Sequence, residues 1–390
     1  MKRKESRLGH IVKEGILDIF YIWKEELREV FKDQGVMIFF FLVPLVYPVL
    51  YAFIYDNEVV RDARLVAVDL CDSHTSREFI RRVDATPDVQ VIAVCSTMEE
   101  ARQMMDRKEA YGILYFPADF SRTIHLGGQG HVSLYTDMSS MLYYKAFLLS
   151  ATEVSLEMGK EQIGVDPVPA EYVAMYNTQN GFAGFLVPPI LMLIIQQTLI
   201  LGICMLGGTS REKNRFHSLL PDTEHYKGTL RVIFGKSLVY VLLYTLVCLW
   251  TLAIVPRLFS LPQTGDPWTV FLFLLPYLFA CIFLAITLSG FMTTRESPMM
   301  IFVFTSILFL FISGISWPKE SIPVFWKTLG YFVPSTPGIQ GFVRINTTGA
   351  TLNEVANEYH LLWIHAGFYF ITACLVYRYQ LIRSRKLLRT

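Results

Sequence analysis

The sequence contains none of several short motifs that carry metal or hydrolytic chemistry. It has no CxxC pair, no H-E-x-x-H and no G-x-S-x-G. No pair of carboxylates lies within an apolar stretch. The net charge is only +1, so no overall field points to nucleic acid. These absences argue against a metal site, an intramembrane enzyme and a nucleic-acid-binding protein. Four of the six cysteines lie singly in apolar stretches: Cys204, Cys248, Cys281 and Cys374.

One stretch resembles the end of a nucleotide-binding P-loop without completing it. In "LRVIFGKS", residues 230–237, Gly235, Lys236 and Ser237 match the last three positions. The first glycine of the motif would fall at position 230, which is Leu230. Without that glycine the loop cannot wrap a phosphate with its backbone N–H groups. We therefore expect this chain to bind no nucleotide and no other cofactor, and Lys236 to extend toward the cytoplasmic membrane surface.

The chain is unusually apolar. Of its 390 residues, 53% are hydrophobic and 14% aromatic, and the mean hydropathy is +0.38. A stretch of about 20 apolar residues crosses a hydrocarbon core of ~30 Å. Stretches of about that length predict a polytopic α-helical membrane protein with six transmembrane helices, at residues 35–55, 181–206, 237–256, 269–292, 298–316 and 360–378. We expect Pro44 and Pro48 to bend the first one.

The N-terminal segment, residues 1–34, predicts an amphipathic helix. Apolar side chains recur at helical spacing, with charged residues on the other faces. The apolar positions are Leu8, Val12, Ile16, Ile19, Trp23, Leu27 and Val30. Because a membrane span follows at once, we expect this helix to lie in the membrane interface. An ordinary amphipathic core helix is the alternative.

Residues 56–179 have the composition of a small α/β domain. Four strand-like runs, "RLVAVDLC", "VQVIAVC", "YGILYFP" and "HVSLYTD", alternate with helical runs in the order β-α-β-α-β-β, which indicates a largely parallel sheet. Capping boxes are expected at Thr75…Glu78 and Thr97…Glu100. Cys71 and Cys95 both end predicted strands, so they form either a disulfide or two independent buried thiols. A long helix is expected from about Ser140 to Ile163.

The distribution of lysine and arginine orients the chain. These residues are frequent in the N-terminal arm, in the loop at 207–236 and in the C-terminal tail, and scarce in the alternate short loops. The positive-inside rule then places both termini and the 207–236 loop in the cytoplasm, and the α/β domain outside. The helical remainder, residues 180–390, carries spans two to six. Its proline-rich segment 317–359 is too broken for a span and predicts short or re-entrant helices at the outer side.

A few polar residues in this region are candidates for function. Gln196 and Gln197 form the most polar pair in any span, and either line a translocation path or hydrogen-bond between helices. Arg295 and Glu296, in the short loop "TTRESP", make a second cytoplasmic contact or cap the bend. His360 and His365 are five residues apart rather than the four that suit zinc on a helix, so no metal site is expected.

With these features the sequence resembles permease subunits of the type-2 ABC exporter family, in particular its long branch. The shared order is an elbow helix, one span, a large outside domain and five further spans. The cytoplasmic loop stands as "SREKNRFHSLLP" and "FGKSLVY", and the last outer segment as "SGISWPKESIPVFWKTLGYFVPSTPGIQGFVRI". The outside domain resembles that of the family in "VAVDLCDSHTSREFIRRVDA" and "YGILYFPADFS". The family's Gly-Thr is Asn214-Arg215 here and a following acid is His217, which leaves Glu212 as the clearest matched position.

The resemblance implies a transport subunit, not an enzyme, driven by a separate ATPase that binds ATP and magnesium. The candidate ATPase-coupling residues are Arg211, Glu212, Lys213, Phe216, Leu219 and Leu220. The implied partners are that ATPase, a second permease copy or paralogue, membrane lipid, and a periplasmic adaptor with an outer-membrane channel. The implied location is the bacterial inner membrane, and the implied activity is export of a hydrophobic or amphipathic small molecule. The alternative is a membrane-anchored receptor or scaffold whose α/β domain binds a ligand.

Overall fold

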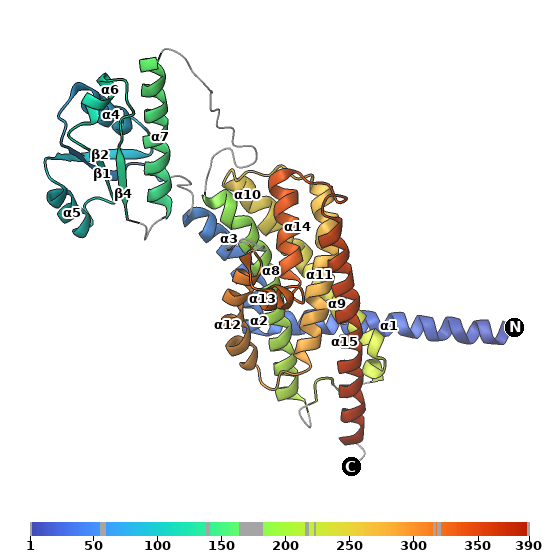
Figure 1. Ribbon diagram of the computed structural model, residues 1–390. Coiled ribbons are helices and arrows are strands. Elements are labelled where there is room, and N and C mark those ends of the chain that lie inside the picture. The colour runs from blue at the N-terminus through green and yellow to red at the C-terminus, as the bar shows by residue number, and fades with distance from the viewer. Residues whose placement is uncertain are drawn as a thin grey trace. The chain divides into compact units, whose positions relative to one another are not determined.

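A computed structural model of the chain describes residues 2–54, 60–137, 141–163, 182–214, 218–221, 224–314, 317 and 321–387. The chain forms two compact units (Figure 1). The helical unit comprises Met1–Asp56, Met175–Asn177 and Gly181–Thr390, and the α/β unit comprises Asn57–Ala174 and Thr178–Asn180. The predicted insertion of an α/β sheet after the first apolar helix is therefore confirmed.

The α/β unit is a four-stranded mixed sheet with the order β2-β1-β3-β4. β1 is parallel to both β2 and β3, and β4 is antiparallel to β3. The elements are β1 (Ala63–Asp69), α4 (His74–Asp84), β2 (Val89–Cys95), α5 (Met98–Asp106), β3 (Gly112–Phe116), α6 (Phe120–His125), β4 (Ser133–Thr136) and α7 (Met141–Ile163). The predicted order of strands and helices and the largely parallel sheet are confirmed.

Both faces of the central strand β1 are covered. Leu65 and Ala67 pack in one cluster with Phe79 of α4 and Phe147 of α7. The alternate residues, represented by Val66, pack in a second cluster that includes α5. Because successive side chains of a strand point to opposite faces, one apolar run serves both layers.

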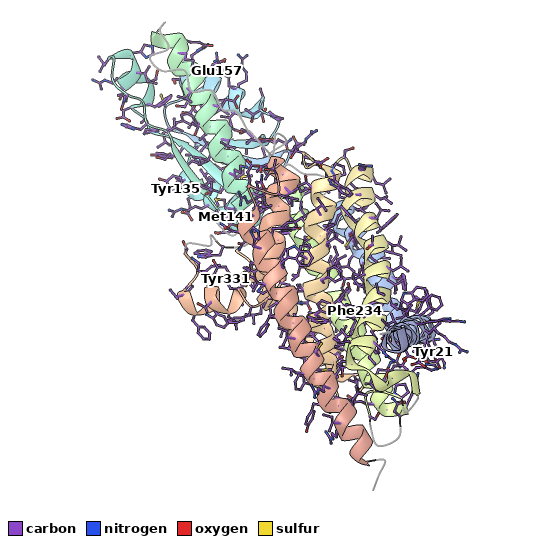
Figure 2. The ribbon with its side chains drawn as sticks, turned by 90° about the vertical axis from the view of Figure 1, so that its right-hand side faces the viewer. Tyr21, Tyr135, Met141, Glu157, Phe234 and Tyr331 are labelled. Atoms are coloured by element: carbon purple, nitrogen blue, oxygen red, sulfur yellow. The ribbon has the colours of Figure 1, made fainter. Side chains whose placement is uncertain are left out.

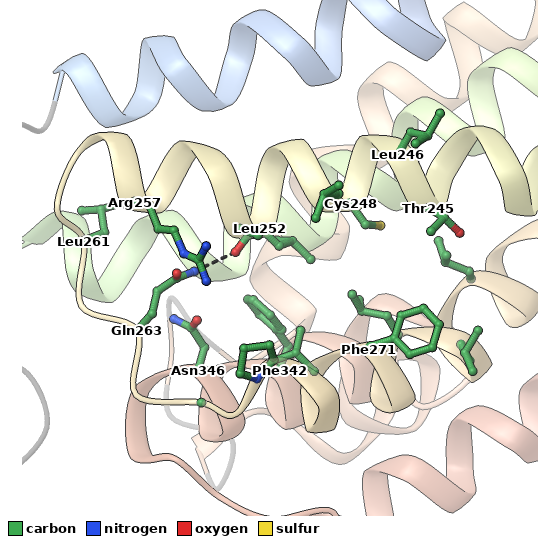
Figure 3. Close-up of a pocket in the computed structure, with 18 of the residues that line it drawn as sticks. Thr245, Leu246, Cys248, Leu252, Arg257, Leu261, Gln263, Phe271, Phe342 and Asn346 are labelled. Carbon is green, nitrogen blue, oxygen red and sulfur yellow. Dashed lines mark hydrogen bonds between the residues drawn. The ribbon is translucent and has the colours of Figure 1, made fainter.

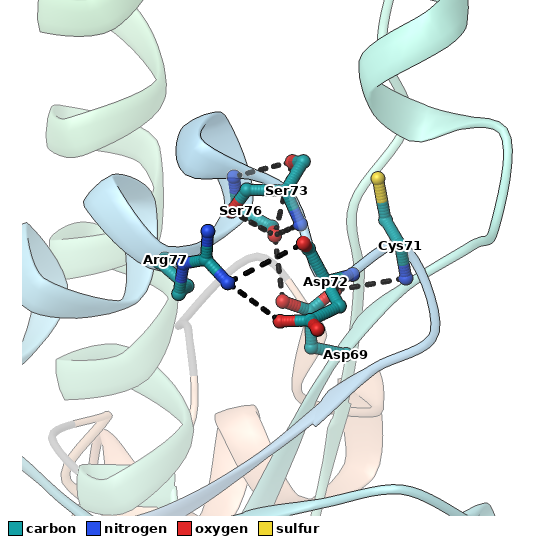
Figure 4. Close-up of polar contacts among 6 residues, drawn as sticks. All are labelled: Asp69, Cys71, Asp72, Ser73, Ser76 and Arg77. Atoms are coloured by element: carbon teal, nitrogen blue, oxygen red, sulfur yellow. Dashed lines mark hydrogen bonds and ion pairs between the residues drawn. The ribbon is translucent and has the colours of Figure 1, made fainter.

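The turn after β1 begins α4 two residues earlier than predicted. Asp69 accepts hydrogen bonds from the backbone of Cys71 and Asp72, both at 3.0 Å, and from the Ser76 hydroxyl at 2.6 Å (Figure 4). Ser73 is the N-cap of α4, and it forms a reciprocal capping box with Ser76. The Thr75…Glu78 box was therefore wrong: Ser73 satisfies the first free N–H groups before Thr75 is reached.

The other two sequence features in this unit had different outcomes. Thr97 caps α5 as predicted, accepting a hydrogen bond from Glu100 N at 3.3 Å. Cys71 and Cys95 are both free cysteines. Cys95 is opposite Val68 in the sheet, and Cys71 lies three residues further along the chain, past the end of β1. The disulfide weighed from the sequence is not formed in the structure.

The helical unit is built from long helices joined by short turns. Its elements are α1 (Lys2–Lys32), α2 (Gln34–Met37), the π-helical η1 (Ile38–Leu42), α3 (Val43–Ile54), α8 (Phe182–Lys213), the 3-10 turn η3 (Glu224–Lys227), α9 (Thr229–Cys248), the π-helical η4 (Leu249–Ile254), α10 (Val255–Leu258), α11 (Pro267–Ser289), α12 (Ser297–Ile312), α13 (Val324–Gly330), α14 (Ser335–Thr348) and α15 (Ala356–Leu387). α8 is almost wholly buried and packs against α3, α11, α12 and α14.

Five stretches of described helix are long and apolar enough to cross a membrane. They are Gln34–Ile54, Ala183–Lys213, Thr229–Leu258, Pro267–Ser289 and Ala356–Arg383. The fifth predicted span, 298–316, corresponds to α12, which has 16 residues. At 1.5 Å per residue that helix is about 24 Å long, short of a ~30 Å core.

The outer segment and the loop before α9 differ in how well they were predicted. Short helices were expected within 317–359, and α13 and α14 lie there. α14 packs closely on α11, because a Cβ atom at Gly338 would lie 2.5 Å from the Tyr277 ring. The loop 207–236 was predicted too long. α8 continues to Lys213 and α9 begins at Thr229, so the P-loop-like letters lie inside a helix.

Candidate functional site

The ends of several helices meet along the second half of α1. α1 packs against α9, and Figure 2, in which α1 is seen end-on, labels Tyr21 of α1 and Phe234 of α9. The same region of α1 reaches the last turn of α8, the segment around η3 and the turn before α12. The second half of α1, together with Asp33, therefore contacts parts of the chain that follow it by 184 to 262 residues in the sequence.

Four acidic residues, which we call the acidic row, line the packed face of α1. They are Asp18, Glu26, Glu29 and Asp33, the last being the N-cap of α2. At about 100° per residue their side chains fall within an arc of roughly 80°. Each has a basic partner from elsewhere in the helical unit. The helical spacing of α1 predicts these acids on a charged outer face, whereas in the structure they pair inward.

Asp18 joins α1 to the start of α9. Its carboxylate pairs with Arg231 and lies 2.7 Å from Nδ1 of His225. Burial alone would raise the pKa of Asp18, but the hydrogen bonds from His225 and Arg231 and their charges lower it overall. The carboxylate is therefore held in its charged form.

Glu26 is the partner of Lys236, the lysine of the P-loop-like stretch. Its carboxylate lies 2.6 Å from Nζ of Lys236, and it also accepts a hydrogen bond from the Tyr240 hydroxyl. The side chains of Glu26 and Lys236 are only 6% and 12% exposed. Lys236 was expected to extend to the membrane surface. It turns inward instead, because a buried acid neutralises its charge.

Glu29 and Asp33 join α1 to α8 and to the turn before α12. Glu29 lies 3.0 Å from Nζ of Lys213. Asp33 accepts a hydrogen bond from Thr209 at 3.0 Å and pairs with Arg295 at 2.6 Å, while it also caps α2. Burial would raise the pKa of Asp33, but the Val36 N–H, Thr209 and Arg295 lower it overall. Arg295 therefore does more than cap its own bend.

The predicted coupling residues are already engaged within the chain. Arg211 is buried and donates to the carbonyl oxygen of Gly290. Glu212 is exposed, and its carboxylate accepts the Arg295 N–H at 2.9 Å. Lys213 pairs with Glu29. Leu219 and Leu220 are each 4% exposed, and Phe216 lies outside the described residues. Among the described members of the set, Glu212 and Lys213 are those whose side chains are at the surface.

The two glutamines of α8 have different surroundings. Gln196 is fully buried, and its amide nitrogen donates to the Ser335 hydroxyl of α14 at 3.2 Å. Gln197 is 7% exposed, and both its amide nitrogen and oxygen are buried without a hydrogen-bond partner in the described part of the chain. Gln196 thus bonds between helices, and Gln197 retains unused hydrogen-bonding capacity inside the unit.

The two histidines of the last helix do not face a common site. His365 is buried, and its Nε2 lies 2.7 Å from the Tyr331 carbonyl oxygen. His360 is exposed. Among the described residues, no group of three or more His, Cys, Asp or Glu side chains could hold a metal ion.

A cavity of about 710 Å³ lies between the α9–α10 helical segment and α11 (Figure 3). Most of its wall is apolar, including Leu252 and Phe271. Polar side chains gather at one end, where Arg257, Gln263 and Asn346 lie near the helix termini. Gln263 donates to the Leu252 carbonyl at 2.7 Å, whereas the guanidinium group of Arg257 has no hydrogen bond or ion pair within the described residues. The volume falls in the range of small-molecule sites.

Comparison with known proteins assigns the chain to a family. A profile described as "ABC-2 family transporter protein" matches residues 35–375. The chain belongs to the ABC-2 transporter family. Two Escherichia coli relatives, from strain K12 and from O157:H7, are named "Probable multidrug ABC transporter permease YbhR". Each is 21% identical over 347 residues, which cover 87% of this chain and 92% of the relative.

ABC-2 permeases are multi-pass membrane proteins, and they generally pair with an ABC ATPase. Asp69, the charged residue at the end of β1 in the α/β unit, has its carboxylate occupied by the turn before α4. This carboxylate therefore holds the turn between β1 and α4.

Proposed function

We propose that this chain is the permease subunit of an ATP-driven exporter that moves a hydrophobic or amphipathic small molecule out of the cytoplasm or the inner leaflet. A separate ATPase binds and hydrolyses ATP with magnesium, and a second permease copy or paralogue completes the pore. In this proposal α12 is also a span, which brings the total to six, both termini are cytoplasmic, and the α/β unit lies outside a bacterial inner membrane. There it would face a periplasmic adaptor and an outer-membrane channel.

The acidic row supports a route by which movement of the ATPase would reach the membrane helices. Ion pairs of Glu26 and Asp33, which are only 6% and 5% exposed, fix α1 to the ends of other helices. Breaking a buried pair leaves an uncompensated charge, so these helix ends are held together strongly. A displacement of α1 or of the exposed Glu212 by an ATPase would be passed to α8, to α9 and to the turn before α12 together. Glu212 and Lys213 remain the proposed contacts, and Phe216 is retained from the sequence.

The 710 Å³ cavity is the observation that carries the proposed cargo class. Its apolar wall suits a hydrophobic body, and its polar end suits one polar or anionic group beside Arg257. The word "multidrug" in the names of the YbhR relatives agrees with such a cargo. Gln197, buried with unused hydrogen-bonding groups, is the proposed position on the path beyond the cavity.

The test compares a substitution that narrows the cavity with a substitution of a neighbouring residue that lies outside it. Ala253 lines the cavity, while Ile254, the next residue of η4, does not. Ala253→Trp should lower transport of a fluorescent amphipathic dye in vesicles several-fold or more, and Ile254→Trp should leave it near wild type. Both variants should still co-purify with a soluble ATPase. A chain that recruits no ATPase would contradict the exporter. Equal transport by the two variants would contradict only the cargo site.

A further inference from the structure

A second cavity, of about 460 Å³, lies where the ends of α8, α11 and α15 meet. We call it the double-arginine cavity. Its lining residues are Arg211, Gly290, Phe291, Leu375, Val376, Tyr379, Gln380 and Arg383. It is separate from the 710 Å³ cavity beside α11, and no residue lines both.

Two cations share this cavity without an acid. Arg211 is 9% exposed and donates to the Gly290 carbonyl, but its Nε is buried without a hydrogen-bond partner. The Gly290 carbonyl also accepts from Gln380, at 3.1 Å. Arg383 is exposed and lies close enough for its charge to act on Arg211. In the described chain neither arginine forms an ion pair, and none of the lining residues is acidic.

This arrangement is unfavourable unless an anion occupies the cavity. Like charges repel, and a buried guanidinium group with an unused N–H has lost water without a full replacement. Arginine presents a planar set of N–H donors that match the oxygens of a phosphate group. The cavity therefore has both the charge and the donors that a phosphate needs.

The surface beside the cavity indicates that the phosphate is carried by a lipid. An apolar stripe runs along α15 to the cavity, and each of its residues is more than half exposed: Ile364, Phe368, Ile371, Leu375 and Tyr379. The stripe runs over the 16 residues from Ile364 to Tyr379, a rise of about 22 Å along the helix. Phe291, 65% exposed, and Tyr379 stand at the rim, where aromatic residues favour the membrane interface. A soluble anion has no apolar part that would contact these side chains.

We propose that the double-arginine cavity binds the phosphate of an acidic phospholipid, whose acyl chains lie along the apolar stripe of α15. The bound phosphate accepts hydrogen bonds from Arg211 and Arg383 and reduces their repulsion. Because Arg211 lies in the last turn of α8 and Arg383 near the end of α15, the lipid holds these two helices together. The proposal needs the chain to lie in a membrane. It does not depend on the cargo or on export.

The test uses the purified full-length chain, freed of lipid in detergent. Phosphatidylglycerol is added, and bound lipid is counted by native mass spectrometry while the melting temperature is measured. Phosphatidylcholine with the same acyl chains and inorganic phosphate are the comparison probes. Phosphatidylglycerol should bind and raise the melting temperature more than either probe. Arg383→Gln should weaken its binding about tenfold or more, the usual effect of losing a hydrogen bond to a charged group.

The matched control is Arg378→Gln, which removes the same charge from an exposed position of α15 outside the cavity. Its affinity for phosphatidylglycerol should remain near wild type. Equal losses in the two variants would show a general surface-charge effect and overturn the site. Phosphatidylcholine has the same phosphate beside a cationic choline, so its equal binding would overturn the assignment to an acidic phospholipid. If inorganic phosphate alone reproduces the full stabilisation, the cavity is an anion site and the lipid assignment is wrong.

Discussion

The two units use charged side chains in opposite ways. In the α/β unit, Arg82 of α4 pairs with Glu78 on the same helix and with Glu161 of α7, and the carboxylates of α7 are mostly exposed. In the helical unit, the acidic row extends from one helix to partners on several others, and Glu26 and Asp33 are almost fully buried. Ion pairs thus lie at the surface of the α/β unit, whereas in the helical unit they connect different helices.

This difference shows where charge matters for each unit. The α/β unit already has two apolar clusters on its sheet, so its exposed ion pairs add little. Helices within a membrane gain little from apolar contact with one another, since lipid is equally apolar. Specific polar pairs at their ends can therefore decide which helices move together. The following predictions test this contrast, beginning with the largest expected effect.

Removing the charge of Glu26 should have the largest effect. Glu26→Gln leaves Lys236 buried without a counter-charge, and breaking a buried pair typically costs about 3–5 kcal/mol. We expect a large fall in melting temperature and in the yield of folded protein. The measurement is thermal unfolding of the detergent-purified chain, followed by fluorescence-detected gel filtration.

Glu25→Gln is the control, because it removes the same charge from the neighbouring residue of α1. Its melting temperature should stay close to wild type. The double variant Glu26→Gln, Lys236→Met should recover much of the loss, since it removes both buried charges. If Glu25→Gln and Glu26→Gln are equally destabilised, the acidic row does not connect the helices as described.

A smaller effect is expected at Asp33 and should depend on pH. The folded-state pKa of Asp33 is lowered, so its stabilising contribution is present above its ordinary pKa of about 4 and is lost as the pH falls through the lower value. Asp33→Asn keeps a side-chain cap for α2 but loses the ion pair with Arg295, at a cost of about 1–2 kcal/mol.

Hydrogen exchange of the α1–α2 junction, corrected for the intrinsic pH dependence, measures this effect. Between pH 7 and pH 5 the wild-type junction should remain protected, and the variant should exchange faster. Below about pH 4 the two should converge, because wild-type Asp33 is then becoming neutral. A difference that persists unchanged at the lowest pH would show that the charge of Asp33 is not what anchors the junction.

Local patterns predicted the elements well and the pairs between them poorly. Alternation and capping residues are local, so the strands, the Thr97 cap and most spans could be identified from the sequence. The partner of Lys236 lies 210 residues earlier in the chain, and nothing in the spacing around either residue marks the other. The inward direction of Arg211 likewise depends on how α8 is turned against its neighbours. For this reason the predicted coupling set mixed surface residues with buried ones.

The smallest effect is expected from the corresponding change in the α/β unit. Arg82→Gln removes the pairs with Glu78 and Glu161, whose side chains are 19% and 59% exposed. Exposed pairs are weakened by solvent and salt, so the melting temperature should change far less than in Glu26→Gln. Hydrogen exchange should rise only in the last turns of α7, where Glu161 lies. A loss as large as that of Glu26→Gln would mean that the α/β unit also depends on its ion pairs, and the contrast between the units would fail.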